Sequence, residues 1–251
     1  MTRFMPATPA WPPHSAPRLY VATPLSGRDA IDLDGSQAHY LITVMRSKVG
    51  DAVSLFDDIS GEYLALVDRV GKRDLTLRID RRTRPREDVP DLWLCAAPIK
   101  RARYDWVAEK ACELGVARFQ PVLTARSVVD KIKPDRLRKQ MVEAAEQCER
   151  TALPEIAPLT KLAALVAGWP RDRHLFFAYE RGGMSFRKAL VANAGPAAIL
   201  IGPEGGFTDD EEALIAGCDR AVPVSLGPRI LRADTAAVAA VSLWMAGRGD
   251  W

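Results

Sequence analysis

The sequence predicts an α/β protein in two parts, a small N-terminal β module and a larger C-terminal domain with a parallel sheet. Short alternating apolar runs separated by turn signals fill residues 18–82, a pattern that is typical of antiparallel strands. From residue 92 onward, apolar strand segments alternate with helical segments, which implies a parallel sheet covered by helices. Two glycine stretches, residues 202–206 and 227–228, each follow a strand segment directly. Ligands bind at the carboxyl ends of such strands, so we expect a ligand site where these stretches meet.

Length and composition exclude several classes of protein. The 251 residues, 48% of them apolar, suffice to bury at least one sizeable core. The net charge of +3 does not by itself indicate a nucleic-acid partner. Four widely spaced cysteines form no CxxC pair and no Cys/His cluster, which predicts reduced thiols, no metal site and a cytoplasmic location. No apolar run approaches the length of a membrane span, and no signal-peptide core precedes residue 18, so we expect a soluble protein without a membrane partner.

Composition also predicts the domain boundaries. Residues 1–17 are rich in proline and small residues, which favours a disordered arm. Residues 18–84 form the β module, with a helical insertion at 39–46. Prolines among charges at residues 83–90 mark a linker, which places the second domain at residues 85–251. The strands predicted in the β module are residues 19–21, 52–56, 62–70 and 75–79.

Basic residues gather in one strand-turn-strand region of the β module and in the segment that leaves it. Acidic neighbours at Asp68, Asp74 and Asp80 fit an ordinary solvated surface. The clustering equally fits a face that contacts phosphates. Composition leaves both interpretations open. The basic residues are Arg69, Lys72, Arg73, Arg78, Arg81, Arg82, Arg84 and Arg86.

The second domain alternates strands and helices up to the C-terminus. Thr208 stands three residues before Glu211, a capping-box spacing that predicts a helix starting just after the first glycine stretch. The other predicted helices are residues 104–114, 135–150, 186–191 and 234–246. The predicted strands are residues 92–97, 119–123, 174–179, 197–201 and 221–226.

The glycine stretches do not match the known nucleotide motifs. Residues 202–206 read GPEGG, which is not G-x-G-x-x-G, and the chain contains no G-x-x-x-x-G-K-[ST]. Neither the dinucleotide mechanism nor the P-loop mechanism is therefore supported. A glycine pair after a strand is usually only a turn, so the stretch alone does not establish a ligand site.

Several longer motifs, taken together, resemble one known family. IGPEGGFTDDE from Ile201 and SLGPRILRADTAA from Ser225 resemble the C-terminal signature of the RsmE family. EKACELGVARFQPVLTARSVV from Glu109 and EAAEQCERTALPEI from Glu143 resemble further segments of that family in the same order. The resemblance covers the chain from about Arg18 to the C-terminus. One departure is Asp234, where the family more often has glutamate, and it affects only local cap geometry.

The resemblance implies a fold and a function that composition cannot show. RsmE proteins are SPOUT-class methyltransferases with a trefoil-knotted C-terminal domain and a PUA-like β-barrel that binds RNA. They are homodimers that transfer a methyl group from S-adenosylmethionine to N3 of a uridine in 16S ribosomal RNA of the small subunit. Two alternatives stay open: a non-catalytic RNA-binding or ribosome-assembly protein on the same fold, and a Rossmann-type nucleotide enzyme, which the missing fingerprint disfavours.

The resemblance assigns the cofactor to the two glycine stretches. Glycines let a backbone approach a ligand closely. Leu226, Ile230 and Leu231 fit the apolar walls of such a pocket and equally fit the protein core. The residues expected to bind S-adenosylmethionine are Ile201, Gly202, Pro203, Glu204, Gly205, Gly206, Leu226, Gly227, Ile230, Leu231 and Thr235.

Methylation of uridine N3 requires loss of its proton and stabilisation of the resulting negative charge. An arginine stays ionised, so it cannot accept the proton but can stabilise the anion. We expect Arg232 to do so, with Arg229 as a second candidate. Glu204 fits either a general base or a carboxylate that orients its loop.

Basic residues at strand ends and in the β module suggest a tract for RNA phosphates. Surface charge or helix caps explain any one of them equally well. A second polar group, Glu143, Gln147 and Arg150, is expected to share one helical face, either solvated or facing the site or subunit interface. The candidate RNA contacts are Arg18, Arg46, Arg69, Lys72, Arg73, Lys100, Arg103 and Arg126.

Overall fold

The computed structural model describes residues 16–179 and 182–251, so the arm expected at residues 1–17 lies almost entirely outside the described residues. The described chain divides into two compact units. Unit 1 runs to Asp88 and also includes Ala145–Ala152. Unit 2 consists of Val89–Ala144 and Leu153–Trp251.

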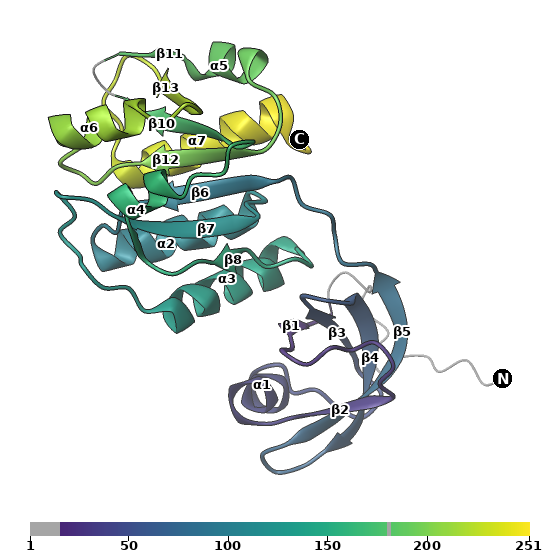
Figure 1. Cartoon of the computed structure of the whole chain (residues 1–251). Coiled ribbons are helices and arrows are strands. Elements are labelled where there is room, and N and C mark those ends of the chain that lie inside the picture. Colours follow the sequence, from purple (N-terminus) through teal and green to yellow (C-terminus); the bar gives the residue numbers. More distant parts are fainter. Residues whose placement is uncertain (1–15, 180–181) are drawn as a thin grey trace. The chain divides into compact units, whose positions relative to one another are not determined.

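Unit 1 contains the strands of the β module and its helical insertion (Figure 1). The insertion is an α-helix, α1, continued by a π-helix, η2, and they bury Ala38 and Leu41 respectively. The elements are β1 (Arg18–Tyr20), β2 (Ala30–Leu33), α1 (Gly35–His39), η2 (Tyr40–Val44), β3 (Ala52–Asp57), β4 (Gly61–Val70) and β5 (Leu75–Arg84).

The five strands of unit 1 form one sheet in the order β1-β3-β4-β5-β2. β3, β4, β5 and β2 pair antiparallel, as the alternating apolar runs predict, whereas the short strand β1 pairs with β3 in parallel. The core is formed by fully buried side chains from the strands and the insertion. Among them are Leu25, Leu41, Val53, Leu55, Ala65, Leu75 and Leu77, each 0% exposed.

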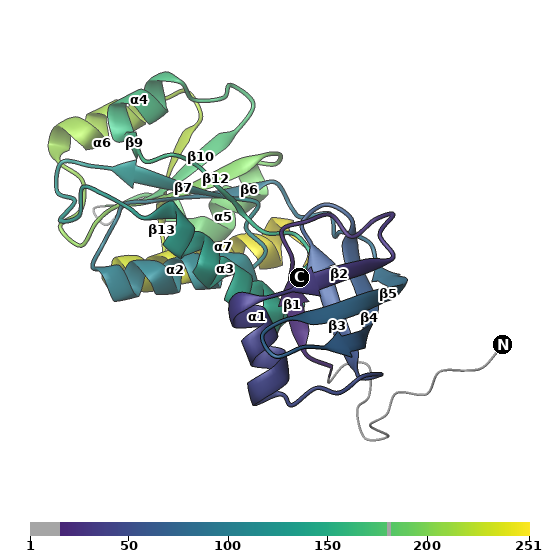
Figure 2. The ribbon, with the colours of Figure 1, turned by 90° about the horizontal axis from the view of Figure 1, so that it is seen from below.

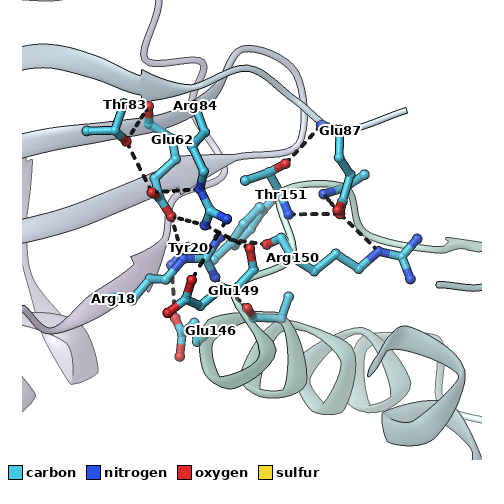
Figure 3. A network of polar contacts seen from close by, with 12 residues as sticks. Arg18, Tyr20, Glu62, Thr83, Arg84, Glu87, Glu146, Glu149, Arg150 and Thr151 are labelled. Atoms are coloured by element: carbon cyan, nitrogen blue, oxygen red, sulfur yellow. Dashed lines mark hydrogen bonds and ion pairs between the residues drawn. The ribbon is translucent and has the colours of Figure 1, made fainter. Parts of the chain in front are cut away.

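A buried carboxylate joins three segments of unit 1 (Figure 3). Glu62 on β4 accepts a hydrogen bond from Arg18 Nε at 2.7 Å and two from Arg84, from Nη2 at 2.8 Å and from Nε at 3.1 Å. Thr83 Oγ1 donates a further bond to it at 3.1 Å. Burial alone would raise the pKa of Glu62, but the hydrogen bonds from Arg84 and Arg18 lower it from 4.5 to about 2.

Arg18 and Arg84 also bind the backbone of Ala145–Ala152, which explains why that segment belongs to unit 1 (Figure 3). Arg18 donates to the carbonyl oxygens of Ala145 and Arg150, the second at 2.7 Å. Arg84 Nη2 donates to the carbonyl oxygen of Glu149 at 2.9 Å. These carbonyls lie in the last turn of a helix or just after it, where backbone acceptors lack partners within the helix.

That helix end corrects one expectation from the sequence. α3 (Pro134–Cys148) stops at Cys148, and Glu149 has a positive φ of 64°. Arg150 therefore lies beyond the helix and is only 5% exposed. Glu143, Gln147 and Arg150 do not share a helical face.

Unit 2 contains a parallel sheet and its covering helices, as the alternation in the sequence predicts (Figure 1). The strands run in the order β11-β13-β10-β12-β6-β7-β8, and β9 pairs with β7. The strands are β6 (Leu92–Ala96), β7 (Arg118–Leu123), β8 (Glu155–Ile156), β9 (Thr160–Lys161), β10 (His174–Ala178), β11 (Met184–Ser185), β12 (Ala197–Ile201) and β13 (Ala221–Ser225). Besides α3, the helices are α2 (Arg101–Glu113), α4 (Leu162–Ala167), α5 (Phe186–Ala192), α6 (Asp209–Ala216) and α7 (Ala233–Arg248).

Helices cover both faces of this sheet, with α4 and α6 on one face and α2 and α7 on the other (Figure 2). All five residues of β12 are buried, as expected for a central strand in a sheet covered on both sides. The predicted capping box is present: Thr208 accepts from Glu211 N, and the Glu211 side chain accepts from Thr208 N. The box fixes the start of α6 immediately after the first glycine loop.

Candidate functional site

The carboxyl ends of four neighbouring strands of unit 2 line one cavity. β13, β10, β12 and β6 lie side by side in the sheet, so the segments that follow them meet at one edge. The cavity has a volume of ≈ 510 Å³, within the range of small-molecule sites. Its lining comes from Lys100, Arg103, Ala178, Tyr179, Ile201, Gly202, Pro203, Glu204, Gly206, Phe207, Glu212, Val224, Ser225, Leu226, Gly227, Pro228, Arg229, Ile230, Leu231, Arg232, Ala233 and Ala236.

The first glycine loop, residues 202–207, is held by neighbouring segments of unit 2. Arg126 Nη1 donates to the carbonyl oxygens of Gly205 at 2.8 Å and Phe207 at 3.0 Å. A Cβ on Gly202 would lie 3.1 Å from the Phe207 ring, a closer approach than ordinary van der Waals contact. Ala125 N also donates to the Glu211 carboxylate at 2.7 Å. The loop is therefore set in place before any ligand binds.

The second glycine loop, residues 226–231, is more open. Gly227 has φ +121°, a conformation that other residues rarely adopt. Ile230 is 85% exposed although it lines the cavity, so it is not part of the core of this chain. Leu226 and Leu231 are half-buried in the cavity wall.

The start of α7 brings charged groups to the same cavity. Arg232 is the N-cap residue of α7 and is exposed, and Asp234 lies in the first turn of the helix. Arg103, from the first turn of α2, lies between two carboxylates: Nη1 is 3.5 Å from Asp234 Oδ2 and 3.8 Å from Glu204 Oε1. These residues are far apart in sequence, and the strand order brings them together.

Most of the residues that the sequence predicts to bind a cofactor line this cavity. Arg229 and Arg232 line it as well. Gly205 and Thr235 lie next to lining residues and are not themselves in the wall. Sequence reasoning missed Tyr179 and Phe207. Tyr179 directly follows β10, so the rule that ligands lie at the carboxyl ends of strands would have found it.

The candidate RNA contacts fall into two groups. Arg46, Lys72, Arg73 and Lys100 are exposed, and Arg69 is exposed but pairs with Asp74 at 2.7 Å.

The second group, Arg18, Arg103 and Arg126, makes contacts that stabilise the fold. The Arg18 side chain is 9% exposed, and its guanidinium lies 3.7 Å from the centre of the Phe56 ring. This burial does not fit a role in phosphate contact. Arg126 and Arg103 hold the first glycine loop and its carboxylate, as described above.

Metal-ligating clusters and cysteine thiols provide no further candidate site in the described part of the chain. Residues 16–179 and 182–251 gather no group of three or more His, Cys, Asp or Glu side chains suited to a metal ion. Cys95, Cys112, Cys148 and Cys218, all in the described ranges, form no disulfide. Burial raises the pKa of Cys95 to about 12, which makes it a poor nucleophile. Within the described ranges, no helix is both long and apolar enough to cross a membrane.

Comparison with known proteins identifies the family. Residues 86–245 match the model of the RNA methyltransferase domain, and residues 33–80 match that of the RNA methyltransferase PUA domain. The chain belongs to this family of RNA methyltransferases. Its relatives include proteins named ribosomal RNA small subunit methyltransferase E. The protein of Rickettsia conorii is 30% identical over 232 residues, which cover 90% of this chain and 93% of the relative. The protein of Synechocystis is 33% identical over 233 residues, covering 90% and 76% respectively.

Solved structures of methyltransferases share this fold over nearly their whole length. A putative methyltransferase from Legionella pneumophila, solved with bound SAM, is 30% identical with a TM-score of 0.85, covering 94% of this chain and 99% of that one. A ribosomal RNA small subunit methyltransferase E from Neisseria gonorrhoeae, bound to S-adenosyl methionine, is 26% identical with the same TM-score and coverage. RsmE family membership, which the sequence motifs indicate, is thus confirmed, and the catalytic interpretation is favoured over a non-catalytic RNA-binding protein.

Proposed function

We propose that this RNA methyltransferase transfers a methyl group from S-adenosylmethionine to N3 of a uridine in 16S ribosomal RNA. The supporting observation is the cavity that gathers both glycine loops and two arginines at the carboxyl edge of the sheet. The names of the relatives support the ribosomal substrate, and the structures solved with the methyl donor support the cofactor. A ribosomal substrate also fits the cytoplasmic location expected from the sequence.

The residues of the cavity fit this cofactor. An adenosine with a charged amino-acid tail needs backbone groups at close range, apolar walls and carboxylates near the cationic groups. Gly202 and Gly206 supply the first, Leu226 and Leu231 the second, and Glu204 and Glu212 the third. The bound cofactor supplies a methyl group on a sulfonium and leaves as a thioether.

Arg232 is the residue proposed to act on the acceptor base. When a C–N bond forms at uridine N3, the N3 proton leaves and negative charge spreads onto the neighbouring carbonyl oxygens. Arg232 is exposed at the cavity from a fixed position, the N-cap of α7, so its guanidinium can stabilise that charge. Arg229, on the open second loop, is the second candidate.

Glu204 is proposed to orient its loop more than to act as a base. Its carboxylate lies 3.8 Å from the Arg103 guanidinium, which favours a fixed position for this side chain. The acceptor of the N3 proton therefore stays unassigned in this proposal.

RNA contacts are proposed for the exposed basic residues Arg46, Lys72, Arg73 and Lys100. Each contact with a phosphate releases counterions, so replacing one of them should weaken binding for all sequences and lower the salt slope by about one unit. Binding that does not respond to salt would contradict this proposal.

A second copy of the chain is the proposed partner in a homodimer. Exposed large apolar side chains stand on α2, α7 and the second glycine loop, namely Trp106, Leu243 and Ile230. α2 and α7 pack against each other, so these side chains occupy neighbouring elements. Light scattering of the purified protein should give twice the mass of the chain, and Leu243→Glu should lower it. A monomeric wild type would contradict the proposal.

A transfer assay tests the proposed reaction. Purified protein, methyl-labelled S-adenosylmethionine and small ribosomal subunits from cells that lack this protein should give label in 16S ribosomal RNA. Digestion should then place the label in 3-methyluridine. Cofactor binding with no transfer to free RNA or to subunits would favour the non-catalytic alternative.

A further inference from the structure

Arg103 joins three segments of unit 2 that border the cavity. It stands in the first turn of α2, while Glu204 belongs to the first glycine loop and Asp234 to the first turn of α7. Its Nη1 lies 3.5 Å from Asp234 Oδ2 and 3.8 Å from Glu204 Oε1. Both distances exceed the roughly 2.8 Å of a charge-assisted hydrogen bond, so the contacts are ion pairs that can tighten or loosen.

Asp234 is the fixed member of this group. Its side chain is 16% exposed, against 36% for Arg103 and 37% for Glu204. Its Oδ1 accepts a hydrogen bond from Thr235 N at 2.9 Å, and a carboxylate in the first turn of a helix is stabilised by the helix dipole. Arg103 is therefore anchored on α7 and extends from there to the glycine loop.

We propose that Arg103 is a positioning residue for methyl transfer, which holds the cofactor loop and the start of α7 in one arrangement, and not a contact for RNA phosphate. Arg232, the residue proposed to face the acceptor base, is the N-cap of α7 and precedes Asp234 by two positions. A change in the position of Asp234 therefore also changes the position of Arg232, because the two residues lie within one helical turn. The inference rests on the proposed function through this role of Arg232.

The charges of the group also disfavour phosphate binding by Arg103. One guanidinium lies within 4 Å of two carboxylates, so the three side chains together carry net negative charge. A phosphate approaching Arg103 meets repulsion from both carboxylates. The sequence suggests that Arg103 contacts phosphate as a cation without carboxylate neighbours. In the structure it has two such neighbours.

Three variants test the proposal: Arg103→Ala, Arg103→Lys and, as a matched control, Arg101→Ala. The control alters an exposed arginine two positions before Arg103 in the same helical turn. A partly exposed ion pair is worth up to about 1 kcal/mol, which is about fivefold in an equilibrium. Arg103→Ala should therefore weaken S-adenosylmethionine binding, measured by calorimetry, by about fivefold. It should lower kcat about tenfold, while RNA affinity and its salt slope stay unchanged. Arg103→Lys should recover part of both losses, and Arg101→Ala should match wild type.

A coupling measurement separates positioning from a general loss of structure. In an Asp234→Asn background, Arg103→Ala should weaken cofactor binding less than it does in the wild type, because the ion pair with Asp234 is already broken. Additive effects of the two changes would overturn the proposal. So would lower RNA affinity with a shallower salt slope and unchanged kcat in Arg103→Ala, which would make Arg103 a phosphate contact.

The calorimetric result does not depend on turnover. If the wild type methylates no ribosomal RNA, the proposed function fails, while the coupling between Arg103 and Asp234 in cofactor binding still tests the positioning role. If the wild type is active and Arg103→Ala matches it in kcat and in cofactor affinity, only the positioning role fails. Thermal unfolding of each variant shows whether the fold is intact.

Discussion

Replacing Glu62 by glutamine tests whether the buried ion network stabilises unit 1. The pKa of Glu62 falls from 4.5 to about 2 in the folded protein, which corresponds to about 3 kcal/mol of stabilisation of the ionised form. Removing one partner of a buried ion pair lowers the free energy of unfolding by about 3–5 kcal/mol, which is similar to the value obtained from the pKa shift. The side chains of Glu62 and Arg18 are 10% and 9% exposed, so solvent screens their interaction little.

Hydrogen exchange is the suitable assay for this variant. The tryptophans of the described residues lie in unit 2, so their fluorescence does not report on unit 1. A loss of about 3 kcal/mol should speed exchange of β3 and β4 amides by about a hundredfold at pH 7. Glu149→Gln is the matched control, because this carboxylate lies 3.8 Å from the same Arg84 but is 58% exposed. Its effect should stay under about threefold.

The stabilisation by Glu62 should depend on pH, and the lowered pKa sets the direction of that dependence. Because the folded pKa is depressed, the stabilisation by Glu62 is complete above about pH 4.5 and is lost as the pH falls toward about 2. The ratio of exchange rates between Glu62→Gln and wild type should therefore shrink over that interval. Exchange of the variant within threefold of wild type at pH 7 would refute the argument.

Three further predictions concern single residues. Thr208→Ala removes the capping box of α6 and should lower the free energy of unfolding by about 1 kcal/mol, with thermal denaturation as the measurement and Thr43→Ala as control. Gly61→Ala should destabilise unit 1 by more than about 1 kcal/mol, because Gly61 has φ +99° and the new Cβ would collide with the backbone of Arg84; unchanged exchange of β4 amides would contradict this. Arg232→Ala should lower kcat at least about a hundredfold while cofactor affinity, measured by calorimetry, changes little; unchanged turnover would remove its proposed role.

Local sequence patterns predict the parallel sheet and the place of the two glycine loops. Buried strands such as β12 are continuous apolar runs, and a capping box is a contact between residues three positions apart. Each of these two features depends only on residues that lie within a few positions of one another in the chain. The meeting of the two glycine loops follows from a general property of parallel sheets, so it is also predictable. The trefoil knot implied by the family resemblance stays a prediction.

Contacts between distant residues set the features that the sequence does not show. Arg18 looks like a surface cation in the sequence, and only its pairing with Glu62 and the carbonyl of Arg150 shows that it is buried. Arg150 continues an apparent helical period, but the positive φ of Glu149 ends the helix before it. In the sequence, Arg103 likewise looks like one more basic residue at a strand end. Its two carboxylate partners, Glu204 in the first glycine loop and Asp234 in α7, lie about a hundred residues or more further along the chain.

We propose that this chain methylates one uridine of the small-subunit RNA at N3. Mass mapping of ribosomal RNA from cells that lack the protein tests it most directly, with cells that express wild type or Arg232→Ala for comparison. We expect one 3-methyluridine of 16S ribosomal RNA to disappear without the protein, to return with wild type and not to return with Arg232→Ala. Retention of every methyl mark in cells that lack the protein would contradict the claim.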